Sequence, residues 1–185
     1  MDRETAYQVI LDHVKTESLR KHLLAVETCM RAYARKVGED EETWGIAGMV
    51  HDFDWEVCPT PESHPTYGAE ILRSRGFPEE LVRAVLSHGN HTGIPRETLM
   101  EKTLYACDEL SGFVTAVALV RPNKSLSGTA VRSVRRKLKD KAFAKSINRD
   151  EIVQGAEELG VELDDHIAFV IEALKPVALQ LGLNE

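Results

Sequence analysis

The hydrophobic residues of this chain recur at intervals of three and four, the spacing of one face of an α-helix. The clearest stripe consists of Leu19, Leu23, Val26, Met30, Tyr33 and Val37. Gly38 follows it and is expected to end the helix, because glycine readily adopts a left-handed conformation. No segment alternates apolar and polar residues as a half-buried strand does. The pattern therefore predicts an all-α fold.

Proline and glycine residues divide this helical pattern into separate elements. The expected helices cover residues 4–14, 17–37, 40–52, 65–75, 79–88, 96–120, 149–159 and 163–181. Between the expected helices 96–120 and 149–159, the stretch Arg121-Pro122-Asn123-Lys124-Ser125 predicts a turn. The basic region after this turn predicts two short helices divided near Asp140. No repeat, low-complexity tract or linker interrupts the chain. Its 185 residues are enough for one domain with a substantial core, so we expect a single domain over residues 1–185.

The net charge of -7 hides an uneven distribution. Residues 121–145 hold nine of the 23 basic residues and a single acid, Asp140, which leaves 29 acids against 14 bases elsewhere. Such a balance disfavours a broad nucleic-acid surface but allows one local anion site.

The cysteines and the apolar runs indicate a cytoplasmic protein. Cys29, Cys58 and Cys107 lie far apart without C-x-x-C spacing, which predicts neither a disulfide framework nor a zinc knuckle. No apolar run approaches the roughly 20 residues of a membrane span. The start, Met1-Asp2-Arg3-Glu4, lacks the apolar region of a signal peptide. We expect no membrane partner.

His51 and Asp52 follow the small apolar run Ile46-Ala47-Gly48-Met49-Val50, which should be buried. A buried carboxylate is costly unless it is paired or bound to a metal ion. Further histidines and an aspartate fall near helix ends or on expected inward faces, and the candidate ligand set is His22, His51, Asp52, His64, His88 and Asp108. A lone histidine on such a face usually has only a structural role. Because several candidate ligands occur together here, binding of a metal ion is the better interpretation.

Imidazole and carboxylate groups without a neighbouring cysteine argue against a structural thiolate site. Six ligands exceed what one tetrahedral ion needs, and two ions sharing a carboxylate are a known arrangement for displacement at phosphorus. We expect one or two divalent ions as cofactor, chosen among Fe, Mn, Mg, Zn and Ni.

This arrangement, with a His-Asp pair 29 residues after a first histidine, resembles the HD superfamily of metal-dependent phosphohydrolases. The stretch from Ser63 to Leu72 looks like the His-Pro-x-x-Gly segment of HD-type phosphodiesterases. The resemblance implies an HD helical bundle over about residues 17–120, with additional C-terminal helices over about 121–185. The tail resembles a bacterial subgroup of predicted HD hydrolases.

The resemblance also implies roles for the candidate ligands. It assigns the first metal to His22, His51, Asp52 and Asp108. It assigns the second metal to His64 and His88, with Asp52 bridging both ions and helping to position the water. His64 precedes Pro65, so it could instead only cap a helix. The following segment, Phe53-Asp54-Trp55-Glu56, departs from the signalling phosphodiesterases, and together with other departures it disfavours a cyclic-dinucleotide substrate.

Other side chains are candidates for catalysis and substrate binding. Asp54 could orient the metal water or act as acid or base, and Glu56 shares that possibility with a surface ion pair. A phosphohydrolase needs fixed cations for the developing phosphoryl charge. We expect Arg121, Lys124 and Ser125 to bind the phosphoryl group of the substrate. The alternative interpretation is that these residues only form a solvated turn. His91 lies in a predicted loop, where it could touch substrate or only face solvent.

The sequence therefore predicts a phosphomonoesterase or phosphodiesterase that uses a metal-activated water on a small phosphorylated metabolite such as a nucleotide. Two alternatives remain open. The first is a di-iron oxygenase, because the same ligand set occurs in that branch of the superfamily. The second is a sensor or scaffold that uses the HD fold without catalysing a reaction. Homo-oligomer formation is also open.

Overall fold

The computed structural model describes residues 1–184, and this part of the chain contains nine α-helices and two short 3-10 helices but no β-strand. The α-helices are α1 Arg3–His13, α2 Glu17–Val37, α3 Glu41–Val50, α4 Thr66–Ser74, α5 Glu79–Ser87, α6 Leu99–Leu119, α7 Val131–Leu138, α8 Arg149–Leu159 and α9 Leu163–Leu174. The 3-10 helices are η1 Asn90–Thr92 and η2 Lys175–Val177. The prediction of an all-α fold is confirmed.

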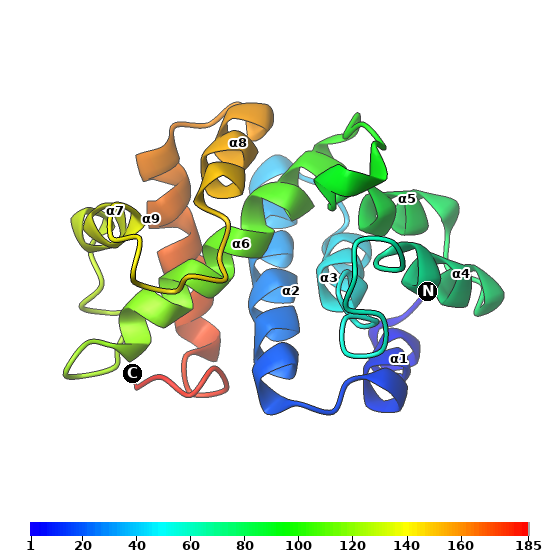
Figure 1. The fold of residues 1–185 in the computed structure, drawn as a ribbon, viewed down its shortest axis with the longest axis horizontal. Helices are drawn as coiled ribbons and strands as arrows, with labels where there is room; N and C mark the ends of the chain where they lie inside the picture. The colour runs from blue at the N-terminus through cyan, green and yellow to red at the C-terminus, as the bar shows by residue number, and fades with distance from the viewer. Residues whose placement is uncertain (185) are drawn as a thin grey trace.

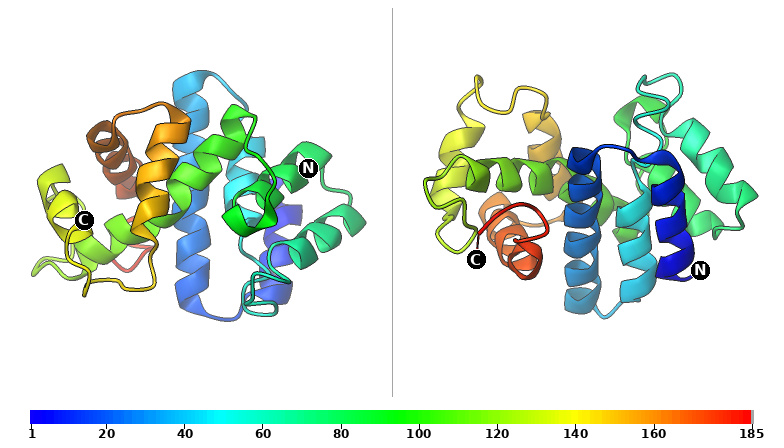
Figure 2. Two further views of the ribbon diagram at one scale, coloured as in Figure 1. Left: turned by 45° about the horizontal axis from the view of Figure 1, so that its top comes forward. Right: turned by 90° about the horizontal axis from the view of Figure 1, so that it is seen from below.

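Two long helices, α2 and α6, cross in the middle of the molecule and divide it into two sides (Figure 1). On one side lie α1, α3, α4 and α5, and on the other lie α7, α8 and α9, an arrangement that the turned views also show (Figure 2). The most extensive packing joins α2 to α3 and α6 to α8. The C-terminal helices therefore complete the same core as the central pair.

The core follows the apolar stripe of the sequence. Leu23, Val26 and Met30 of α2 are fully buried, as are Leu104 and Leu110 of α6. Burying a side chain of this size contributes roughly 1.5–3 kcal/mol relative to exposure, which holds the two helices together. Val37, the last residue of the predicted stripe, is exposed instead, because the chain turns away at Gly38 with a left-handed φ of 80°.

Several helix ends differ from the prediction. The third helix stops at Val50 rather than at residue 52, so His51 and Asp52 begin a turn. The last helix stops at Leu174 because Pro176, which has no amide hydrogen, closes it as a 3-10 turn.

The basic region forms one helix, α7, and not the two that were predicted. Residues 139–148 form no helix. The Arg149 guanidinium occupies carbonyls that a second helix would use, donating to Asp140 at 3.2 Å, to Ala144 at 3.3 Å and to Ile147 at 3.0 Å. Periodicity alone gave no sign of this competing set of hydrogen bonds.

None of the helices in residues 1–184 combines the length and the apolar character that crossing a bilayer requires.

A glycine allows α8 to approach α6 closely. A Cβ atom on Gly155 would lie 2.7 Å from the Ala106 Cα of α6, and a backbone atom cannot move aside as a flexible side chain can. Close packing of the two helices therefore depends on the missing side chain, and it fixes how α8 lies against α6.

We predict that Gly155→Ala lowers the free energy of unfolding by about 1–2 kcal/mol, since overpacking outweighs the gain in helix propensity of about 1 kcal/mol. Urea denaturation measures the change. The matched control is Gly112→Ala in α6, where a Cβ has its nearest neighbours at 3.7 and 3.8 Å, an ordinary contact. The control should be as stable as the parent protein or more so. Equal stability of Gly155→Ala and the parent would contradict the packing argument.

Candidate metal centre

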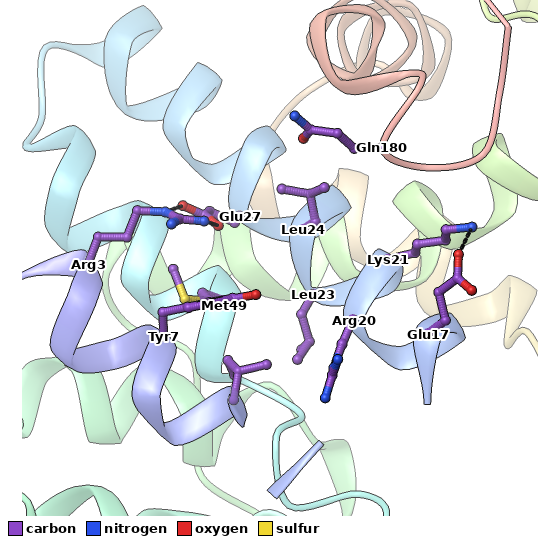
Figure 3. A pocket seen from close by; sticks show the side chains of 11 residues that line it. Arg3, Tyr7, Glu17, Arg20, Lys21, Leu23, Leu24, Glu27, Met49 and Gln180 are labelled. Atoms are coloured by element: carbon purple, nitrogen blue, oxygen red, sulfur yellow. Dashed lines mark hydrogen bonds and ion pairs between the residues drawn. The ribbon is translucent and has the colours of Figure 1, made fainter. Parts of the chain in front are cut away.

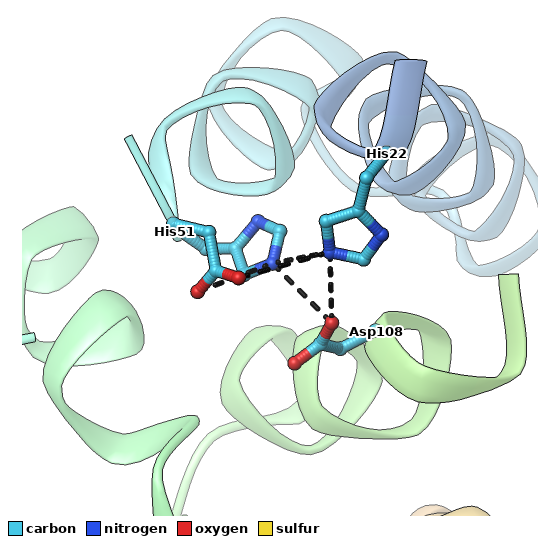
Figure 4. A group of neighbouring side chains, drawn as sticks. His22, His51 and Asp108 are labelled. Atoms are coloured by element: carbon cyan, nitrogen blue, oxygen red, sulfur yellow. Dashed lines mark hydrogen bonds and ion pairs between the residues drawn. The ribbon is translucent and has the colours of Figure 1, made fainter. Parts of the chain in front are cut away.

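Three chain segments bring the first group of candidate ligands together. His22 comes from α2, His51 from the turn after α3, and Asp108 from α6 (Figure 4). Asp52 follows His51 in the same turn. The Oδ1 atom of Asp108 lies 3.1 Å from His22 Nε2 and 3.4 Å from His51 Nε2. All four residues can direct one ligand atom to the same point, because these atoms lie within 4.8 Å of one another.

The second group contains Asp52, His64 and His88. His64 precedes α4 and His88 directly follows α5. Their Nε2 atoms lie 3.2 and 3.1 Å from Asp52 Oδ1. Asp52 therefore belongs to both groups, which is the position that a bridging carboxylate would need.

Three histidines are oriented by hydrogen bonds through their other ring nitrogen. His51 Nδ1 donates to the Gly48 carbonyl at 2.8 Å, and His88 Nδ1 donates to the Val85 carbonyl at 2.5 Å. His64 Nδ1 donates to Asp54 Oδ1 at 2.8 Å. Each bond places the proton on Nδ1, which leaves Nε2 of the neutral ring with a lone pair directed at the carboxylates.

The spacing of these nitrogens fits metal ligation. His22 Nε2 and His51 Nε2 lie 3.2 Å apart, and the Nε2 atoms of His64 and His88 lie 3.3 Å apart. Two bonds of about 2.1 Å at a tetrahedral angle place two nitrogens about 3.4 Å apart. Asp52 Oδ1 is buried without a hydrogen bond of acceptable geometry. A divalent cation bound at this oxygen would supply the partner that it lacks. The donor atoms of these residues therefore fit the divalent ions that the sequence predicts.

The electrostatics of the cluster also favour positive charge between the carboxylates. Burial opposes protonation of His51, but Asp52 and Asp108 outweigh it and raise the pKa of His51 to about 9. Burial likewise opposes protonation of His64, but Asp52 and Asp54 raise its pKa to about 9. Burial disfavours ionised Asp52, yet the surrounding histidines hold its pKa well below the usual value. Metal ions and protons therefore compete for the same nitrogens.

A cavity of about 580 Å³ opens above both ligand groups. His91 lines it and donates from Nε2 to the His64 carbonyl at 2.7 Å, so the structure brings this predicted substrate contact to the site. The sequence pointed to Trp55 only as part of the unusual segment after Asp52, and it did not indicate other residues of the wall, among them Asn90, Glu109, Ser146 and Glu151. Burial and the neighbouring Asp108 raise the pKa of Glu109 to about 8.

Asp54 lies behind His64 and not on the cavity wall. The carboxylate is fully buried, with Oδ1 accepting from His64 Nδ1 and Oδ2 accepting from the Gly68 amide at 2.9 Å. Both oxygens are therefore occupied. This position suits the orienting role among those foreseen for Asp54, whereas direct proton transfer to a substrate needs a group that faces the cavity. Glu56 instead accepts from the Lys15 and Thr16 amides, away from the ligands.

The structure does not bring Arg121, Lys124 and Ser125 to the ligands. Arg121 lies thirteen residues after Asp108, just beyond the end of α6, which places it about 20 Å away at 1.5 Å per residue. Arg121 lines a separate hollow with Arg136. Ser125 is buried and accepts from Thr129 through its carbonyl.

A further hollow of about 480 Å³ lies against α1, α2 and Gln180 (Figure 3). Its charged side chains pair with one another: Arg3 with Glu27 at 2.7 Å and Lys21 with Glu17 at 2.6 Å. The candidate ligands are not among its lining residues.

The fold and the site define a helical domain with a histidine and aspartate centre suited to divalent ions. The HD domain family matches residues 19–112, and the chain belongs to this family. This confirms the resemblance seen in the sequence, and the match falls within the expected core of residues 17–120.

Proteins named Ribonuclease Y are similar to about half of the chain. The one from Lawsonia intracellularis is 32% identical over 98 residues, and the one from Oleidesulfovibrio alaskensis is 26% identical over 98 residues. The one from Desulfotalea psychrophila is 29% identical over 97 residues. Each alignment covers 52% of this chain but only 18–19% of the ribonuclease. No solved structure matches the chain significantly.

We predict that single substitutions separate the two metal positions. His22→Ala and His64→Ala should each lose about one of two bound ions, because each removes a ligand of one group only. Asp52→Ala should lose both, with little loss of folded protein, since it removes a buried carboxylate that both groups share. Metal content after dialysis, measured by mass spectrometry, tests this. Retention of full metal content by Asp52→Ala would show that the ligand assignment is wrong.

We also predict that Asp54→Asn weakens metal binding at the His64 and His88 position by about 10–100-fold, as loss of a partner behind a ligating histidine commonly does. The position of His22 should keep its affinity. Metal titration by calorimetry resolves the two affinities. Asp12→Asn removes an exposed carboxylate that binds Arg75 and is the matched control. An unchanged second affinity in Asp54→Asn would refute the orienting role.

Proposed function

We propose that this protein is a metal-dependent phosphohydrolase that acts on a small phosphorylated metabolite, such as a nucleotide. The observation that carries the proposal is the Asp52 carboxylate, which belongs to both ligand groups and lines an open cavity. Its Oδ1 lies 3.2 and 3.1 Å from His64 and His88 Nε2, and its Oδ2 lies 3.9 Å from His22 Nε2. Ions about 3.5–4 Å apart and bridged by one carboxylate suit displacement at phosphorus. Membership of the HD family supports the same reaction class.

The residues of the chain divide the work. His22, His51 and Asp108 would hold one ion, His64 and His88 the other, and Asp52 both. Divalent ions in these positions supply an activated water and an electrophilic contact for a phosphoryl oxygen.

Other groups position these ligands. Asp54 keeps the His64 ring in the tautomer that presents Nε2, and the Gly48 and Val85 carbonyls do the same for His51 and His88. His91 lies at the cavity wall near His64, where it can donate to or accept from a substrate that enters. The positive charge for the transferring phosphoryl group must come from the ions, because the cavity wall formed by the described residues includes neither lysine nor arginine.

The relatives named Ribonuclease Y suggest a phosphodiester as the second candidate bond. A phosphodiesterase must accept two ester groups at phosphorus, whereas a phosphomonoesterase accepts one. The phosphomonoesterase and the phosphodiesterase would use the same metal ligands. They differ only in whether the cavity has room for a second ester group at phosphorus.

We predict that the metal-loaded protein hydrolyses phosphate esters and that Asp52→Ala lowers kcat/KM by at least about 1000-fold, since the shared ligand is lost. The assay compares p-nitrophenyl phosphate with bis-p-nitrophenyl phosphate in the presence of Mn²⁺, Fe²⁺, Zn²⁺, Mg²⁺ or Ni²⁺. Asp12→Asn serves as the control with unchanged turnover. If no phosphate ester is hydrolysed with any of these ions, the proposed function is wrong, and oxygen uptake by the iron-loaded protein becomes the next assay.

A further inference from the structure

The cavity above the metal ligands also carries two acidic groups that do not belong to the ligand set. Glu109 follows Asp108 on α6, and Glu151 comes from the first turn of α8. Asn148 joins them, donating its backbone amide to Glu109 Oε1 at 3.2 Å and its side-chain amide to Glu151 Oε1 at 2.9 Å. Asn90 also donates to Glu151 Oε1, at 3.4 Å. The two glutamates thus form one fixed acceptor surface, supplied in part by the C-terminal helices.

The described part of this surface contains no lysine or arginine of its own. Within residues 1–184, neither glutamate forms an ion pair with lysine or arginine, and the described cavity wall contains no such residue. With or without its proton, a glutamate offers acceptor oxygens and no positive charge. Hydroxyl groups that enter beside the two glutamates can therefore donate hydrogen bonds to them, whereas a phosphate meets no lysine or arginine on the described wall that could bind it.

We propose, on the basis of the phosphohydrolase function above, that Glu109 and Glu151 select the substrate. The favoured class is a phosphate monoester of a hydroxyl-bearing alcohol, such as a sugar or nucleoside monophosphate. Its single phosphoryl group lies at the metal ligands, and its hydroxyl groups donate to the two carboxyl groups. A second phosphate, or the backbone of RNA, would find no lysine or arginine on the described cavity wall to bind it.

The remaining wall is compatible with such a substrate. Trp55 is 44% exposed and lines the cavity beside His64, with the two rings 5.0 Å apart and edge-on. Its apolar surface can pack against the carbon face of a sugar or against a base. The volume of about 580 Å³ accommodates a molecule of this size.

A charge reversal tests the proposal. The metal-loaded protein is assayed with adenosine 5′-monophosphate, adenosine 5′-diphosphate and a short single-stranded RNA. We expect kcat/KM for the monophosphate to exceed that for the other two by at least about tenfold. Glu151→Lys should reduce this preference at least tenfold, and Glu151→Gln should raise KM for the monophosphate with a smaller effect on kcat. Circular dichroism and metal content confirm that each variant is folded and loaded.

The matched control is Glu157→Lys, which makes the same charge change on the exposed side of α8. It should leave the preference unchanged. Equal turnover of monophosphate and diphosphate by the parent protein would overturn the inference, as would a preference that survives Glu151→Lys. Absence of hydrolysis of every phosphate ester would instead overturn the proposed function, so the two failures can be told apart.

Discussion

The structure depends on two carboxylates that lie largely inside the fold, each with a side chain only 18% exposed. Asp52 and Asp108 lie where the central helices and the turn after α3 meet, and carboxylates in such surroundings require positive charge nearby. Four histidines, each from a different segment of the chain, provide nitrogens that can carry this charge as a proton or bind it as a metal ion. Helices that carry these nitrogens must pack closely enough to share one centre, and the glycine contacts between neighbouring helices permit that approach.

The candidate ligands could be chosen from the sequence because each combines a polar side chain with a place on an apolar face or at a helix end. His22 and Asp108 lie within apolar stripes, and His51 and Asp52 end a buried run. Such positions are informative because burial makes an isolated charge costly. The fold class was predictable for the same reason, since the apolar period of the helices is long and regular.

The rest of the site depends on how distant helices pack, which periodicity does not describe. Proximity along the chain suggested Arg121 and Lys124, but a helix carries residues apart at 1.5 Å per residue. Glu151 lies 43 positions after Asp108 and reaches the cavity only because α8 packs on α6. Only Gly155 gave a hint of that packing, and a single glycine in a helix has several possible explanations.

The two metal positions proposed above would share the Asp52 carboxylate, and this sharing has a thermodynamic consequence. A ligand shared by two positions makes their affinities interdependent, because the first cation fixes the carboxylate for the second while its charge repels the newcomer. By linkage, each cation alters the affinity of the other by the same factor. Loading then becomes stepwise, and the fraction of fully loaded protein responds to the concentration of free metal more steeply or more gradually than for independent positions. The activity of this protein would thus report the supply of metal in its surroundings.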